Sequence, residues 1–165
     1  MSALMVRLAD DETLVDIDGD RYVIPLGAAT LRRNELVSDP PRPEELTNAI
    51  GIVVDHLDDM LREVPSAAEP DEVAVTGDLA IAVSAVEFGG TPSWPFKLER
   101  AAAEEVFRTV ATEATAERAL NPGLPADAVD TIVGACCIVV GLMRKLHLDR
   151  IDIVADPATN AGEKS

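Results

Sequence analysis

Residues 73–90 limit the possible folds of this chain more than any other stretch. They read Val-Ala-Val-Thr-Gly-Asp-Leu-Ala-Ile-Ala-Val-Ser-Ala-Val-Glu-Phe-Gly-Gly. The first four predict a short buried strand, Gly77 a turn, and Asp78 the N-cap of a helix that runs to the two glycines. In α/β folds such a turn presents backbone N–H groups to an anion. Because Asp78 is itself an anion, the sequence predicts the backbone turn of a phosphate site but not the side chains that would bind a phosphate.

The composition indicates one domain with an aliphatic core. The chain has 165 residues, of which 47% are hydrophobic and only 3% aromatic. This length is enough to bury a substantial core. A core built from Val, Ile, Leu and Ala suits a buried α/β sheet and its helices.

The charge balance excludes some partners. With 30 acidic and 14 basic residues, the net charge is −16. Such a surface repels nucleic acid and anionic membranes, so we expect neither as a partner. It also suits the high-salt cytoplasm of a halophilic cell, where screening removes the self-repulsion. An ordinary acidic mesophilic protein is the alternative.

The cysteines and the apolar runs indicate a soluble cytoplasmic protein. Cys136 and Cys137 are adjacent, without metal-ligand or redox-motif spacing, and are expected to be small buried residues in a reducing cytosol. The N-terminus lacks the pattern of a signal peptide. The longest apolar run, residues 131–143, is too short to span a bilayer.

The N-terminal third predicts a meander followed by a helix. Three short strands are expected at residues 3–8, 13–17 and 21–24, joined by two polar turns into an antiparallel sheet. If the first segment is frayed, a single hairpin remains. Residues 28–39 are expected to be a connection, either irregular throughout or with an extended piece at 29–31. A helix with an apolar stripe then begins near Pro43 and ends at Pro65.

The C-terminal half predicts three helical segments and a strand. The helical segments are expected at 99–112, at 115–120 and, as the longest and most buried, at 126–148. Residues 91–96 are expected to be an irregular crossing, and residues 150–154 the last strand. We expect residues 1–155 to form a single lobe and residues 156–165 a flexible tail.

Short motifs occur in a fixed order along residues 21–154. They are Pro-Leu-Gly-Ala-Ala-Thr-Leu at 25–31, Asp-Pro-Pro-Arg-Pro-Glu-Glu-Leu at 39–46, Leu-Glu-Arg-Ala at 98–101, Glu-Arg at 117–118, Asn-Pro-Gly-Leu at 121–124, Ala-Val-Asp at 128–130, Ile-Val-Gly-Ala at 132–135 and Arg-Ile-Asp-Ile-Val at 150–154. The series resembles the Ppx/GppA (exopolyphosphatase/guanosine pentaphosphate phosphohydrolase) family, whose PLGAVRL and PPTPEEL segments are similar to the first two.

The resemblance implies an α/β fold. It is the C-terminal half of the actin-like core, a ribonuclease-H-like (actin-like ATPase, ASKHA) half-domain. The expected architecture is the three-stranded antiparallel meander plus two further strands, packed by about four helices.

The departures from that family bear on function. The family's first half carries a phosphate loop, acidic metal ligands and the carboxylate that activates water, and no segment here resembles its DIGGGS loop. Its second phosphate loop ends in Gly-Gly-Thr, where this chain has Thr76, Gly77 and Asp78. A carboxylate in place of the threonine removes a hydroxyl donor and repels phosphate. The family's Ser and Arg after the last strand are also absent from residues 155–162.

We therefore expect a non-catalytic, exopolyphosphatase-like protein that serves in binding, regulation or assembly. It would have no catalytic residues and no cofactor, with Gly77 and Asp78 marking a degenerate phosphate loop. The missing first half predicts pairing as a homodimer or with a separately encoded partner protein.

Two alternatives stay open. The first is a minimal phosphohydrolase that acts on polyphosphate or a phosphorylated nucleotide, with Asp16, Asp18 and Asp20 holding Mg²⁺, since alternating carboxylates suit a hard cation. The second is a structural or interaction protein with no phosphate contact.

Overall fold

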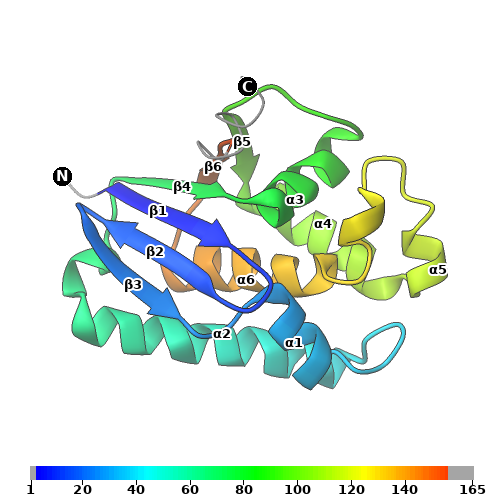
Figure 1. Cartoon of the computed structure of the whole chain (residues 1–165), viewed down its shortest axis with the longest axis horizontal. Coiled ribbons are helices and arrows are strands. Elements are labelled where there is room, and N and C mark those ends of the chain that lie inside the picture. Colours follow the sequence, from blue (N-terminus) through cyan, green and yellow to red (C-terminus); the bar gives the residue numbers. More distant parts are fainter. Residues whose placement is uncertain (1–2, 156–165) are drawn as a thin grey trace.

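A mixed six-stranded sheet packed by helices forms the molecule (Figure 1). The structure, a computed structural model, describes residues 3–155, so the predicted tail at 156–165 lies outside the described residues. Across the sheet the strands run in the order β3-β2-β1-β4-β6-β5. The predicted α/β class is confirmed, and the sheet has one strand more than the five expected.

The predicted meander forms the first half of the sheet. Its strands are β1 (Ala3–Leu8), β2 (Thr13–Ile17) and β3 (Asp20–Ile24). They pair antiparallel, with Val6 opposite Val15 and Val15 opposite Tyr22. The alternative of a frayed first segment is wrong, because β1 also pairs in parallel with β4 (Glu72–Thr76) and so has a partner on each side.

The second half of the sheet contains a strand that the sequence did not predict. β6 (Arg150–Ile153) pairs in parallel with β4, as the fold requires. β5 (Phe96–Glu99) pairs antiparallel with β6 and forms the edge. Only Leu98 in β5 is fully buried. A four-residue strand with two charged positions has too short a pattern to be distinguished from a loop.

Residues 28–39 are not the irregular or extended connection that was expected. Ala28–Asn34 form a helix, α1. Its sequence has no capping side chain, and its first N–H groups are instead satisfied by the turn after β1. The carbonyl of Ala9 accepts from Ala28 N at 3.2 Å, and that of Asp10 accepts from Ala29 N at 2.8 Å. Because the cap comes from a distant segment, local sequence patterns do not reveal it.

The long amphipathic helix was predicted correctly. α2 spans Pro43–Glu63, and a short 3₁₀ turn, η1 (Pro65–Ala68), follows it. Glu45 in its first turn accepts hydrogen bonds from the Ser38 hydroxyl at 2.7 Å and from the Arg42 backbone N–H at 3.3 Å. The Ser38 hydroxyl, as the main cause, holds the pKa of Glu45 below its usual value.

The most buried helix is shorter than predicted. α6 spans Ile132–Lys145, a separate 3₁₀ turn, η2 (Ala126–Ala128), precedes it, and α2 is the longest helix. Every residue from 132 to 143 is buried, so its predicted central position is confirmed. α6 ends just before His147, whose φ of 54° is left-handed. A left-handed residue terminates a helix.

Three further helices lie between β4 and α6 in the chain. They are α3 (Asp78–Phe88), α4 (Arg100–Thr112) and α5 (Thr115–Arg118). Arg144 of α6 donates two hydrogen bonds to the Glu104 carboxylate of α4, at 2.9 and 2.6 Å, and these lower the pKa of Glu104. Within residues 3–155, no helix is both long and apolar enough to cross a bilayer.

Candidate functional site

The candidate site lies where β1 and β4 end. The two strands are parallel neighbours, with Val6 opposite Val75, so their carboxyl ends meet at the same edge of the sheet. Ligands of open α/β sheets bind at this edge. Gly77 makes the turn from β4 into α3 with a φ of 104°. A Cβ on Gly77 would lie 2.6 Å from the carbonyl oxygen of Leu8, so only glycine fits against the end of β1.

Asp78 does not cap the helix in the predicted way. Gly77 is the N-cap of α3, Asp78 is the first helical residue, and no side chain makes a capping hydrogen bond there. The tight turn at Gly77 begins the helix one residue earlier than expected. The Asp78 carboxylate therefore acts as a charge in the first turn, where it offsets the positive end of the helix dipole.

Two adjoining hollows open beside this turn. The larger, about 410 Å³, lies between α3 and the segment before α6, and the smaller, about 230 Å³, lies over the end of β1. Both are lined by Asp10, Asp78 and Leu79. Asp127 lines the larger hollow and Arg7 the smaller. We call the two together the strand-end cleft; three carboxylates and one guanidinium line it.

The sequence located part of this cleft. Gly77 and Asp78, which the sequence marks as the position of a degenerate phosphate loop, lie beside it, whereas Asp10 and Asp127 were missed. Asp10 follows a strand that is parallel to β4, so a correct prediction of that pairing would have placed it beside Asp78. Asp127 lies in the 3₁₀ turn η2, and no local signal places that turn beside Asp78. The hydroxyl of Thr76 is directed elsewhere, since it donates to the Val154 carbonyl at 2.9 Å.

The three aspartates of the metal hypothesis are not grouped. Asp16 receives two hydrogen bonds from Arg21 of the neighbouring strand, the shorter at 3.1 Å. Asp18 accepts from the Ala3 backbone N–H at 3.3 Å, and Asp20 is exposed at the start of β3. Among residues 3–155 no three His, Cys, Asp or Glu side chains are arranged to hold a metal ion.

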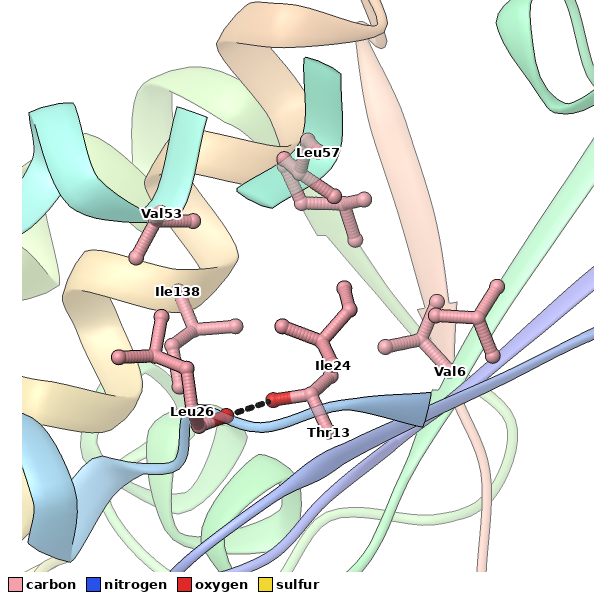
Figure 2. A pocket seen from close by; sticks show the side chains of 9 residues that line it. Val6, Thr13, Ile24, Leu26, Val53, Leu57 and Ile138 are labelled. Carbon is pink, nitrogen blue, oxygen red and sulfur yellow. Dashed lines mark hydrogen bonds between the residues drawn. The ribbon is translucent and has the colours of Figure 1, made fainter. Parts of the chain in front are cut away.

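The small void in the core is not a ligand site. It lies between the sheet and helices α2 and α6, and its volume is about 10 Å³ (Figure 2). The Thr13 hydroxyl donates to the Leu26 carbonyl at 2.7 Å, so the polar side chain of the lining is already satisfied. A space of this size holds at most one water molecule.

Both cysteines and Ser84 are buried. Cys136 and Cys137 are free thiols in α6, as predicted. Burial raises the pKa of both, to about 12 for Cys137, so neither is a thiolate near neutral pH. Ser84 is buried in α3 and donates to the Ile81 carbonyl at 2.7 Å. All three side chains therefore lie in the core, away from the strand-end cleft.

The fold has clear relatives among solved structures. An exopolyphosphatase-like protein matches with a TM-score of 0.82 and 19% identity, over 93% of this chain and 55% of its own. The Ppx/GppA phosphatase of Aquifex aeolicus matches with a TM-score of 0.84 and 15% identity, over 93% and 53%. The chain has the fold of about half of a Ppx/GppA protein. An exopolyphosphatase from Cytophaga hutchinsonii matches less closely, with a TM-score of 0.72 and 13% identity, over 93% and 53%.

These matches establish the fold of the chain and leave its chemistry open. The chain spans about half the length of the structures it matches, as expected for one lobe. Comparison with protein-family models and with curated proteins found no match. Identities of 13–19% establish the architecture, and the chemistry has to be argued from the strand-end cleft itself.

Proposed function

We propose that this chain is a non-catalytic, exopolyphosphatase-like module that serves in binding, regulation or assembly. The observation that supports the proposal is the charge of the strand-end cleft. The turn that would receive a phosphate in the resembling family begins α3 with the carboxylate of Asp78. Asp10 and Asp127 line the same cleft.

The magnitudes favour repulsion of a phosphate. Two unit negative charges about 4 Å apart near a protein surface repel by roughly 4 kcal/mol. The positive end of a helix contributes about 0.3–1 kcal/mol, and about 2 kcal/mol in buried geometries. One carboxylate therefore outweighs the attraction of the α3 N-terminus, and Arg7 is opposed by three carboxylates in the cleft.

The assembly role is supported by the length of the matched structures. Each is about twice as long as the part that this chain covers. In those proteins the matched half therefore exists beside a second half. We propose that this lobe also pairs, either with a second copy of itself or with a separately encoded partner protein.

A second candidate function is a minimal phosphohydrolase with Mg²⁺ held by Asp16, Asp18 and Asp20. The observation in favour of this function is the fold, which the chain shares with the Ppx/GppA phosphatase of Aquifex aeolicus. Against it, Arg21 already neutralises Asp16. We therefore rank it second.

The first prediction separates the two functions. Purified protein with long-chain polyphosphate and Mg²⁺ is expected to release no phosphate, because the cleft repels the substrate and the three aspartates are not grouped. The measurement is colorimetric detection of released phosphate over several hours. Turnover that disappears in Asp16→Ala, but persists in the matched surface variant Asp55→Ala, would establish the phosphohydrolase instead.

A binding measurement in the same samples tests the cause. Titration of the wild-type protein with pyrophosphate in a calorimeter is expected to give no binding heat. Asp78→Thr restores the hydroxyl found in the resembling family and removes one carboxylate, so its pyrophosphate affinity is expected to exceed that of Asp127→Thr. Tight pyrophosphate binding by the wild-type protein would contradict the proposed role of the cleft charges.

A further inference from the structure

The edge of the sheet at β5 carries a self-complementary charge pattern. Among residues 3–155, β5 is the last strand of the sheet, with β6 on its inner side (Figure 1). Lys97 and Glu99 of this strand are exposed. Within residues 3–155 neither of these side chains makes an ion pair. An edge strand offers its unpaired backbone groups to another strand.

The register with β6 shows which backbone groups point outward. Arg100 N donates to the Asp149 carbonyl at 2.8 Å. In the observed antiparallel register Leu98 lies opposite Ile151, two residues along the same ladder. Hydrogen-bonded pairs alternate in such a ladder, so Leu98 and Phe96 also bond to β6. The N–H and C=O groups of Lys97 and Glu99 therefore face the free edge.

We propose that the β5 edge binds the β5 strand of a second copy of this chain, in antiparallel pairing about a two-fold axis. Three symmetric registers use the outward-facing groups. Centring on Lys97 places two lysines opposite each other, and centring on Glu99 places two glutamates opposite each other. Centring on Leu98 places Lys97 of each copy opposite Glu99 of the other, which gives two ion pairs and four backbone hydrogen bonds.

An exposed aromatic side chain lies at the same edge. Phe88 at the end of α3 is 59% exposed, and its ring contacts that of Phe96 edge-to-face, with centroids 6.2 Å apart. A second strand added to β5 would cover part of this apolar surface. Because β5 has only four residues, the interface is small, and we expect a weak, concentration-dependent dimer.

A lysine on a short edge strand also opposes unspecific pairing of that strand with strands of other molecules. The two roles are compatible here, since the charges oppose two registers and favour one. The inference develops the assembly part of the proposed function. It is tested by molecular mass alone, so its failure can be distinguished from a failure of the phosphate prediction.

The test is a charge-reversal experiment read by sedimentation equilibrium over a wide concentration range. A buffer of about 0.15 M salt, with a Debye length of about 8 Å, screens the long-range repulsion between two acidic copies and leaves contact pairs intact. The wild-type protein is expected to dimerise. Lys97→Glu and Glu99→Lys are each expected to weaken the dimer about tenfold, because each places like charges opposite one another twice.

Two further samples test whether the charge pairs themselves hold the dimer together. The doubly reversed chain, Lys97→Glu with Glu99→Lys, is expected to dimerise as the wild type does. An equimolar mixture of the two single variants is expected to form a mixed dimer, because all their opposed pairs are of opposite sign. Asp20→Lys, on the β3 edge, is the matched control and leaves the dimer unchanged.

The proposal is overturned by three results. They are a wild-type monomer at every concentration, single variants that dimerise as tightly as the wild type, or a mixture of single variants that stays monomeric. Circular dichroism of each variant establishes that it is folded, since these exposed side chains do not contribute to the core.

Discussion

Arg118 is a buried cation whose partners are backbone carbonyls. Its side chain is 3% exposed, and it donates to Val110 at 3.0 Å, Glu113 at 2.8 Å and Val129 at 3.0 Å. These carbonyls belong to α4, to the segment after it and to the segment that leads into α6. Burial lowers the pKa of Arg118, but a guanidinium stays protonated in proteins. One residue therefore joins three segments that have no strand pairing to hold them.

Replacing Arg118 is expected to destabilise the protein strongly. Arg118→Met keeps most of the side-chain volume but leaves three inward-facing carbonyls without their donor. We expect the free energy of unfolding to fall by about 2–4 kcal/mol. Urea denaturation followed by circular dichroism measures it. Arg108→Met is the control, because the Arg108 side chain is 63% exposed and, within residues 3–155, forms an ion pair only with Glu105. Its effect should stay within about 0.5 kcal/mol. Equal effects in the two variants would remove the structural role of Arg118.

At the scale of the elements, α6 approaches α1 closely through a glycine. A Cβ on Gly134 would lie 2.4 Å from the carbonyl oxygen of Ala28, so the two helices could not keep their separation with any larger residue. Gly51 on α2 is different, because a Cβ there would meet nothing within 4 Å. Helical glycines thus have opposite roles in this chain, one permitting packing and one only weakening its helix.

Alanine at the two positions is expected to have opposite effects. Gly134→Ala forces α1 and α6 apart and should lower the free energy of unfolding by about 1–3 kcal/mol. Gly51→Ala should raise it by about 0.4–1 kcal/mol, because alanine restricts the unfolded chain and favours the helix. Thermal and urea unfolding of both variants provide the measurement. A neutral Gly134→Ala would show that the α1–α6 contact is looser than the structure indicates.

At the scale of the whole molecule, charge opposes folding. The net charge of −16 is spread over 165 residues, and the described ion pairs are mostly solvent-exposed. Exposed pairs each contribute about 0–1 kcal/mol, too little to offset the general repulsion among the acidic groups. The aliphatic core has to supply the stability against that repulsion.

Salt is therefore expected to stabilise the folded state at neutral pH. Raising KCl from about 0.05 M to about 1 M shortens the Debye length to about 3 Å and should raise the melting temperature. The control is the same titration near pH 4.5, close to the sequence pI of about 4.3, where the net charge is small and less repulsion remains to be screened. Salt effects of equal size at the two pH values would indicate a general solvent effect rather than screening of the acidic surface.

Local patterns were sufficient for much of the fold. The meander, α2, the β4–Gly77–α3 unit and the central burial of α6 were predicted because each has its own periodicity or turn residue. The colinear motifs led to the Ppx/GppA-like fold that the structural matches show. Gly77 and Asp78 were placed at the candidate site because a strand, a glycine and a helix follow one another directly in the sequence.

Contacts between distant segments decided the rest. α1 is capped by carbonyls of the turn after β1, and β5 exists because β6 pairs with it. Asp10 reaches the strand-end cleft from the turn after β1, and Asp127 reaches it from η2. None of these depends on the order of neighbouring residues. Each depends on which segments pack together, and that is determined by burial of the whole core around α6. The sequence showed the carboxylate of Asp78 at this turn, but for the same reason the two further carboxylates of the cleft, Asp10 and Asp127, could be seen only in the folded chain.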